Sequence, residues 1–176
     1  MKASTKMLAE AGAMIALAQG LSYVKIFEAP YGGSVTAGSM IPIILFSLRW
    51  GLKSGLIAGL VYGLLQFILG GTIYSFNPVS ILFDYLIAFA ALGLAGMFKN
   101  SLKGVFAGTF LGVLGRFICH VISGVVVWAS YAPAGTSPLV YSVLYNGSYL
   151  LPELIITMVI VGVLYKPLIS KVSQRA

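Results

Sequence analysis

The stretch VFAGTFLGVLGRFICHVISGVVVWAS, residues 105–130, decides the class of this protein. It carries one charged side chain, Arg116, in 26 residues. Such a run is typical of a transmembrane helix, because about 20 apolar residues cross the hydrocarbon core of a bilayer. The whole chain agrees, since 59% of its 176 residues are hydrophobic and 9% are charged, whereas about a quarter are charged in soluble domains. A water-soluble enzyme or regulator is therefore excluded.

Five further apolar runs accompany this stretch. We predict an all-α integral membrane protein, with one transmembrane domain over residues 1–176 and six helices. The second run contains Pro42 and is too short to cross about 30 Å of bilayer without tilt or help from its neighbours. The helices are expected at residues 7–24, 39–50, 56–71, 78–98, 105–130 and 150–165.

Positive charge predicts the orientation, because Lys and Arg collect on the cytoplasmic side of membrane proteins. A cytoplasmic N-terminus leaves only Lys25 outside and Arg116 within the membrane. Both termini are therefore expected in the cytoplasm, and the net charge of +7 does not require a nucleic-acid partner. A signal peptide cleaved after Ala18 is the rival interpretation, but Glu10 interrupts its apolar stretch and cleavage would leave an odd number of spans. The nine basic residues expected inside are Lys2, Lys6, Arg49, Lys53, Lys99, Lys103, Lys166, Lys171 and Arg175.

Motifs for cofactors are missing from the sequence. Cys119 is the only cysteine, so the chain has no internal disulfide and no C-x-x-C or Cys/His zinc spacing. A phosphate-binding P-loop is also absent, so ATP hydrolysis by that route is not expected. We expect neither a metal nor a cofactor.

Polar residues inside the membrane are functional candidates, because they are costly there. Arg116, His120, Gly124 and Trp128 follow one another at four-residue spacing and form one slanting stripe about 18 Å long. The stripe predicts the wall of a polar pocket. The alternative is a packing surface in which Arg116 is merely paired and His120 hydrogen-bonded.

Three carboxylates complete the set of candidates. The pair Asn77-Pro78 predicts a helix start, which puts Asp84 about 10 Å below the outer surface. Arg116 is the only basic residue at membrane depth, so we predict an Asp84–Arg116 pair. Glu153 follows Pro152 and is expected to stabilise the first turn of the last helix through the helix dipole. Glu10 is expected to face cytoplasmic water.

The first helix has a face of small residues. Ala9 and Ala13 are four residues apart, and Gly12, Ala16 and Gly20 form a second row. Small residues at this spacing let another helix approach closely. That helix can belong to this chain or to a partner.

Several local motifs occur together in a fixed order. In chain order they are Tyr74-Ser75-Phe76-Asn77-Pro78, Asp84-Tyr85, His120-x-x-Ser123-Gly124-x-x-x-Trp128, Tyr131-Ala132-Pro133, and Tyr141 to Tyr145-Asn146-Gly147. In these motifs the chain resembles the thiamine-specific S components of energy-coupling factor (ECF) transporters, the ThiT/YuaJ family. The resemblance implies a six-helix S component in the bacterial plasma membrane that captures thiamine from outside. It also implies a complex with a transmembrane coupling subunit and two cytoplasmic ATPases, and it favours that subunit as the partner of Ala9 and Ala13.

The resemblance implies a set of thiamine-binding residues as well. In the family, an acidic residue of the fourth helix and a basic residue of the fifth bind the aminopyrimidine ring. The resemblance assigns these roles to Asp84 and Arg116. The best-known members have glutamate and lysine at these positions. Trp128 and His120 would flank the rings of the ligand. The other members of the wall would be Tyr85, Gly124, Tyr141, Asn146 and Tyr74, and Tyr31 corresponds to a tryptophan of the first loop.

The chemistry of the residues agrees with thiamine. An indole face attracts the thiazolium cation, and a carboxylate accepts a hydrogen bond from the pyrimidine amino group. Three alternatives stay open: an S component for another vitamin such as riboflavin, a membrane-embedded acid–base enzyme using Asp84, His120 and Glu153, and a self-contained proton-coupled carrier. The enzyme lacks an H-E-x-x-H motif, and the carrier lacks the usual internal repeat.

Overall fold

The structure, a computed structural model, describes residues 4–98 and 101–164. Six helical segments and one β-hairpin make up this part of the chain. The segment Pro78–Met97 is one continuous span, although its helical geometry changes along its length. In chain order the elements are α1 (Thr5–Ser22), β1 (Lys25–Glu28), β2 (Ser34–Thr36), α2 (Ile41–Trp50), α3 (Leu52–Leu69), α4 (Pro78–Ser80), the π-helical η1 (Ile81–Leu86), α5 (Ile87–Ala90), the 3₁₀-helical η2 (Ala91–Met97), α6 (Leu102–Val126), the short η3 (Ala129–Tyr131) and α7 (Pro138–Leu164).

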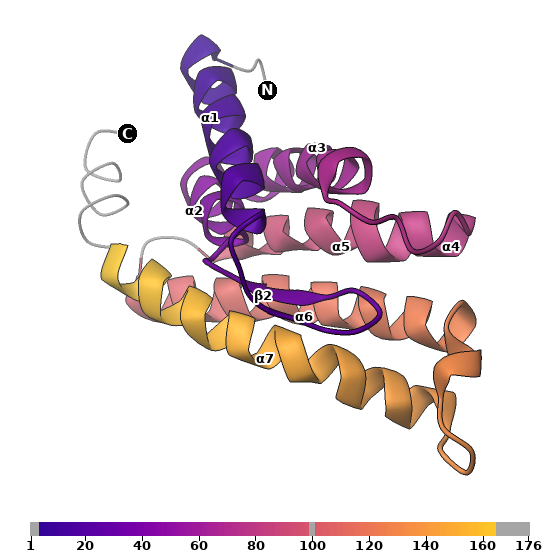
Figure 1. The fold of residues 1–176 in the computed structure, drawn as a ribbon. Coiled ribbons are helices and arrows are strands. Elements are labelled where there is room, and N and C mark those ends of the chain that lie inside the picture. The colour runs from indigo at the N-terminus through magenta and orange to yellow at the C-terminus, as the bar shows by residue number, and fades with distance from the viewer. Residues whose placement is uncertain (1–3, 99–100, 165–176) are drawn as a thin grey trace.

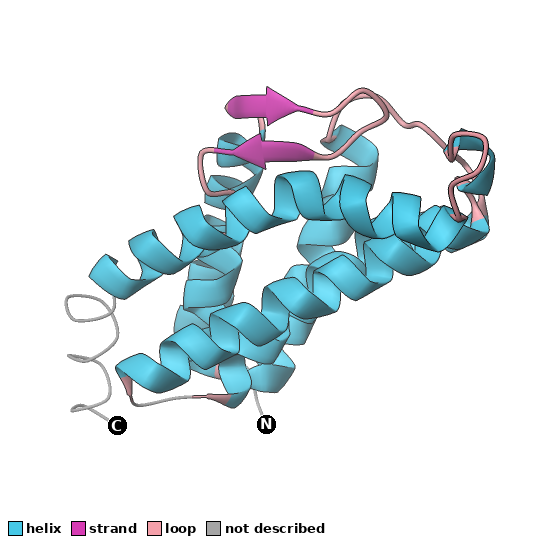
Figure 2. Cartoon of the chain, turned by 90° about the horizontal axis from the view of Figure 1, so that it is seen from below, coloured by secondary structure: helices cyan, strands magenta, loops and turns pink. Residues whose placement is uncertain are grey.

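The long helices lie side by side, and α1 crosses them at a steep angle (Figure 1). In the described part of the chain, α3, the span Pro78–Met97, α6 and α7 are long and apolar enough to cross a membrane. The antiparallel hairpin β1–β2 lies along one side of this bundle, next to α7 (Figures 1 and 2). The six-helix architecture is confirmed. The cytoplasmic location of the termini stays a prediction, and Lys2, Lys99, Lys166, Lys171 and Arg175 lie outside the described residues.

The core forms around the short helix α2. Every residue from Ile41 to Leu48 is buried, and α1, α3 and η2 pack around it. Gly51, with φ of 87°, then reverses the chain directly into α3, a conformation that only glycine adopts readily. The sequence predicts a second helix too short to span the bilayer alone, and α2 indeed has only ten residues. The neighbouring helices cover it.

Close packing fixes the span that carries Asp84. Gly55, Gly59 and Gly63 recur every four residues along α3 and face Pro78–Met97. A Cβ atom at Gly59 would overlap the backbone oxygen of Phe89, and one at Gly63 would overlap that of Tyr85. Small residues at this spacing allow two membrane helices to touch backbone to backbone. The two helices therefore hold each other in one register.

The last helix departs most from its prediction. It begins at Pro138 and not at residue 150, so it is 27 residues long and contains Pro152 in its interior. Proline favours the first turn of a soluble helix, but membrane helices tolerate it internally when neighbours satisfy the freed backbone. The connection between the last two helices is correspondingly shorter than their predicted ranges imply, and the connection between the first two contains a hairpin that the sequence does not predict.

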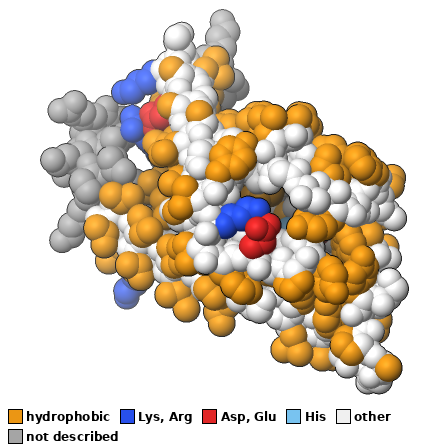
Figure 3. Space-filling view, viewed as in Figure 1, with side chains coloured by type: hydrophobic (Ala, Val, Ile, Leu, Met, Phe, Trp, Pro, Cys, Tyr) orange, Lys and Arg blue, Asp and Glu red, His pale blue; other side chains and the backbone are white. Residues whose placement is uncertain are grey.

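Apolar side chains dominate the surface (Figure 3). Large exposed residues are spread over several helices and include Ile57 on α3, Leu144 on α7 and Val163 near its end. This surface is the one that a bilayer requires. A small group of basic and acidic side chains interrupts it over the hairpin, where Lys25 and Glu28 form an ion pair of 2.6 Å.

Candidate ligand-binding site

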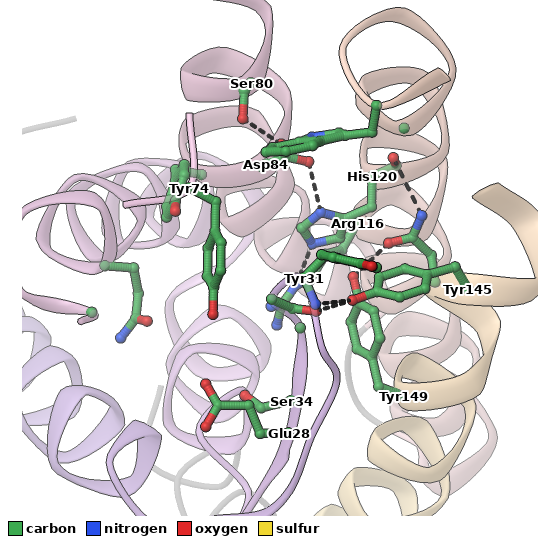
Figure 4. A pocket seen from close by; sticks show the side chains of 18 of the residues that line it. Glu28, Tyr31, Ser34, Tyr74, Ser80, Asp84, Arg116, His120, Tyr145 and Tyr149 are labelled. Atoms are coloured by element: carbon green, nitrogen blue, oxygen red, sulfur yellow. Dashed lines mark hydrogen bonds and ion pairs between the residues drawn. The ribbon is translucent and has the colours of Figure 1, made fainter. Parts of the chain in front are cut away.

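A cavity of about 200 Å³ lies at the end of the bundle that is predicted to face outward. The span Pro78–Met97, α6, α7 and the hairpin all contribute side chains to it (Figure 4). The structure brings all ten predicted binding residues to its wall. They are Tyr31, Tyr74, Asp84, Tyr85, Arg116, His120, Gly124, Trp128, Tyr141 and Asn146. Their part in binding a ligand stays a prediction.

The π-helical turn η1 carries Asp84 and Tyr85 to the cavity. Such turns insert an extra residue into a helix and are frequent at functional sites. Asp84 Oδ2 accepts hydrogen bonds from the hydroxyls of Ser80 and Ser123, each of 2.6 Å. Three donors, counting His120, hold this partly buried carboxylate, so its position is fixed before any ligand arrives.

His120 lies between the predicted acid and base. Its Nδ1 is 3.1 Å from Asp84 Oδ1, and Arg116 Nε is 3.2 Å from its Nε2. Arginine can only donate, so Nε2 must accept and Nδ1 must carry the proton that goes to Asp84. The three side chains form a triad, Asp84–His120–Arg116, in which the imidazole is neutral.

The predicted direct Asp84–Arg116 ion pair is wrong. Among the described residues Asp84 contacts His120 and not Arg116, and the guanidinium carbon of Arg116 lies 4.2 Å from the centre of the Phe89 ring. The cause is depth, because Arg116 lies one helical turn from His120 on α6, farther from Asp84. A cation over an aromatic face is stabilised by the ring quadrupole.

Helix α7 supplies an aromatic wall that sequence reasoning largely missed. Tyr141, Tyr145 and Tyr149 line the cavity at four-residue spacing. Asn146 is buried and donates to the backbone oxygen of His120 at 3.4 Å, while Tyr149 donates to Asn146 Oδ1 at 2.6 Å. The spacing was available as a signal. In the sequence, however, Pro152 marks a helix start and places this segment before the last helix.

Aromatic rings close the cavity where the hairpin turns. Tyr31 packs edge-on against Tyr131 at 4.6 Å between ring centres, and Tyr131 packs in the same way against Trp128 at 5.5 Å. Tyr145 binds the tip of the hairpin twice. Its hydroxyl donates to Gly32 O at 2.7 Å and accepts from Tyr31 N at 3.0 Å. The hairpin therefore covers the cavity from the side of α7.

Carboxylates gather at this cavity. The sequence has four acidic residues, and three of them, Glu28, Asp84 and Glu153, line it. Glu10, the fourth, was expected to face water and instead forms a 3.2 Å ion pair with Arg49. Of the basic residues that the structure describes, only Lys25 and Arg116 line the cavity, so acidic side chains outnumber basic ones there and favour a cation.

Glu153 was predicted in the first turn of the last helix, and that prediction is wrong. It lies well inside α7, 15 residues after Pro138, and its exposed fraction is 2%.

Gln66 of α3 also lines the cavity, and no sequence pattern predicts it there. Its amide donates to Gln19 Oε1 at 2.8 Å and to Ser22 Oγ at 2.9 Å, joining α3 to α1.

The cavity can hold a flat cation by charge, stacking and hydrogen bonds. It offers carboxylates, aromatic faces and one guanidinium, a combination that suits an aromatic cation with an amino group. In the described part of the chain, no group of three or more His, Cys, Asp or Glu side chains is placed to hold a metal ion.

Comparison with known proteins agrees with this geometry. The sequence profile described as "Thiamine transporter protein (Thia_YuaJ)" matches residues 8–173. This chain belongs to that family. It is 39% identical over 149 residues to thiamine transporter ThiT of Bacillus subtilis, covering 77% of each chain. It is 34% identical over 178 residues to thiamine transporter ThiT of Lacticaseibacillus paracasei, covering 88% of this chain and 84% of that one.

A solved structure has the same architecture. ThiT from Listeria monocytogenes superposes with a TM-score of 0.79 at 25% identity, covering 92% of this chain and 93% of that one. Together with the apolar helices, membership of the family makes this chain a multi-pass protein of the bacterial plasma membrane.

Proposed function

We propose that this chain is the thiamine-binding S component of an ECF transporter. The observation that carries the proposal is the cavity itself, which collects three of the four acidic side chains of a basic protein and covers them with aromatic rings. Thiamine matches both features, since it is flat and permanently cationic. The names of the relatives support the same substrate.

The geometry suggests how the two rings are held. The amino group of the pyrimidine would donate to Asp84, whose position is fixed by Ser80, Ser123 and His120. The thiazolium ring would lie against aromatic faces, of which Trp128 gives the strongest attraction for a cation. Figure 4 shows Asp84 and Glu28 well apart on the wall of the cavity, and Glu28 is paired with Lys25.

Delivery to the cytoplasm would need other proteins. The sequence has no P-loop, so we propose that a coupling subunit and two ATPases provide the energy. The exposed face of α1 suits the coupling subunit. Ala9 and Ala13 are exposed, and a Cβ atom added at Gly12 or Gly20 would meet nothing within 4 Å. A partner helix could approach this face closely.

The alternatives fit the cavity less well. Riboflavin carries no permanent positive charge, so it would gain less from the carboxylates and aromatic faces of the cavity. An acid–base enzyme using Asp84, His120 and Glu153 would need all three groups free, whereas Glu153 is already bound by Thr36. We therefore retain thiamine capture as the function.

Isothermal titration of the detergent-purified protein tests the proposal. Thiamine should bind with a stoichiometry of one, whereas riboflavin and biotin should give no heat of binding. Binding of riboflavin in preference to thiamine would overturn the substrate. If none of the three binds, capture of a vitamin by this chain is wrong.

A further inference from the structure

Glu153 is the most deeply buried of the three carboxylates that line the cavity. Its exposed fraction is 2%, and no Lys or Arg forms an ion pair with it among residues 4–98 and 101–164. The triad Asp84–His120–Arg116 does not use it. An unpaired charge inside a membrane protein is costly, so the contacts that Glu153 does make need an explanation.

All of these contacts go to one residue of the hairpin. Glu153 Oε1 accepts from the backbone N–H of Thr36 and from Thr36 Oγ1, the latter at 2.6 Å. Thr36 is the last residue of β2 and is buried. Its hydroxyl has one proton, which goes to Glu153, so Thr36 Oγ1 accepts from Ser39, both from N at 3.0 Å and from Oγ at 2.9 Å. Glu153 thus joins α7 to the base of the hairpin and to the start of α2.

The same helix binds the tip of the hairpin. Tyr145 contacts Tyr31 and Gly32 through its hydroxyl, and it lies two turns before Glu153, about 12 Å along the helix. Between these two points Val35 packs with Tyr149 and Leu150. Gly32 and Gly33 both have positive φ values, 92° and 84°, so the tip turns at two residues whose conformation only glycine adopts readily.

We propose that Glu153 is a positioning residue, which acts through Thr36 to hold the hairpin over the cavity and so slows the release of the ligand. The proposal rests on the proposed function only for the identity of that ligand. A carboxylate serves here because one of its oxygens accepts two hydrogen bonds at a buried position, where such bonds are strong. Tyr145 holds the tip of the hairpin, and Glu153 holds its base.

Two variants separate this role from simple charge attraction. Glu153→Gln keeps an oxygen that can accept from Thr36, and Glu153→Leu removes it. Stopped-flow fluorescence gives the rate constant of thiamine dissociation. We expect Glu153→Leu to raise it about tenfold or more, the loss of a charge-assisted hydrogen bond, and Glu153→Gln, which removes the charge and keeps the acceptor, to raise it much less. Thr36→Val, which keeps the N–H donor, should fall between them.

Hydrogen–deuterium exchange gives a readout that needs no ligand. In the unliganded protein, Glu153→Leu should speed exchange of the amides of residues 34–36, while amides of α6 keep their wild-type protection. Glu10→Gln is the matched control, because it removes the acid that pairs with Arg49 and does not line the cavity. It should change neither the hairpin amides nor the dissociation rate.

Three results would overturn the proposal. The first is wild-type dissociation and exchange in Glu153→Leu. The second is a Glu153→Gln variant as impaired as Glu153→Leu with unchanged hairpin exchange, which would mean that the charge attracts the ligand directly. The third applies if Glu153→Leu does not fold. The test then rests on Thr36→Val, and a wild-type rate of thiamine dissociation in that variant would overturn the proposal. Failure of thiamine to bind the wild-type protein would instead refute the proposed function, and the exchange experiment would still test the hairpin.

Discussion

His120 sets the chemistry of the candidate site at the scale of single residues. It receives a hydrogen bond from Arg116 and gives one to Asp84, so the two charged groups are joined through a neutral ring. This arrangement lets the acid and the base lie at different depths in the membrane. It also makes the three side chains dependent on one another, because removing one leaves a buried polar group without its partner.

A double-mutant cycle tests the triad. Asp84→Asn and His120→Leu should each raise the Kd for thiamine, because each removes the same contact. The double variant should therefore lose less than the sum, with a coupling energy of about 0.5–3 kcal/mol. Titration calorimetry on the four proteins measures it. Strict additivity would mean that the two side chains act separately.

The two tryptophans give a second test at this scale. Trp128 lines the cavity, whereas Trp50 ends α2 and packs against Phe46 and the Arg49 guanidinium. A cationic ring on an indole should quench its fluorescence, so thiamine should quench the wild-type protein and Trp50→Phe to the same extent.

Trp128→Phe should abolish the quench and weaken binding by about 0.5–2 kcal/mol. A fluorescence titration of the three proteins suffices. A quench that persists without Trp128, or that is lost without Trp50, would contradict the assigned site and leave the six-helix fold unaffected.

The elements differ in how firmly packing holds them. The helices α3 and Pro78–Met97 touch at their backbones, while the hairpin is held through side chains of α7. The hairpin is thus the element whose position a single substitution can change. The exposed face of α1 contributes no residue to the wall of the cavity.

Gly33→Ala should displace the hairpin. Its φ of 84° is unfavourable for alanine by about 1–2 kcal/mol, and the added Cβ would overlap the ring of Tyr149. We expect a lower thiamine affinity and a lower midpoint of thermal unfolding. Gly135→Ala is the control, since Gly135 has a similar φ of 83° but nothing within 4 Å of the added atom. If both variants lose the same thiamine affinity and thermal stability, backbone strain alone accounts for the effect and displacement of the hairpin is contradicted.

Enlarging the face of α1 should separate transport from binding. Ala9→Trp or Ala13→Trp places a bulky ring where the coupling subunit is proposed to dock, but no residue of the cavity wall lies there. Uptake of labelled thiamine by cells should be lost while the Kd stays unchanged. Ile57→Trp, an exposed position on α3, should preserve both. Loss of thiamine binding in the α1 variants would show that this face packs within the chain.

The whole molecule is a cavity carried by an apolar helix bundle, without a sequence motif for an energy source. Reconstituted alone in liposomes, it should bind thiamine but not concentrate it against a gradient. Adding the ATPase module and ATP should produce accumulation. The measurement is vesicle uptake of radiolabelled thiamine with and without the partners, and accumulation by this chain alone would establish a self-contained carrier.

The sequence by itself determined the membrane helices and much of the cavity wall. Composition and the length of the apolar runs settle the class, because only helices long enough to cross a bilayer satisfy their own backbone there. The stripe Arg116, His120, Gly124 and Trp128 could be found because helical spacing puts residues four apart on one face. These features depend on the period of a helix, which is a local property of the chain.

Only the tertiary structure decided where α7 begins, how η1 turns Asp84 toward the cavity, and what lies between Asp84 and Arg116. Local sequence patterns place a helix start at Pro152, whereas α7, packed against α6, continues through Pro152 without ending. The role of Glu153 could not be predicted either, since its partner Thr36 is 117 residues away in the sequence. A contact over that separation leaves no trace in local patterns, because it forms only when the fold has brought the hairpin against α7.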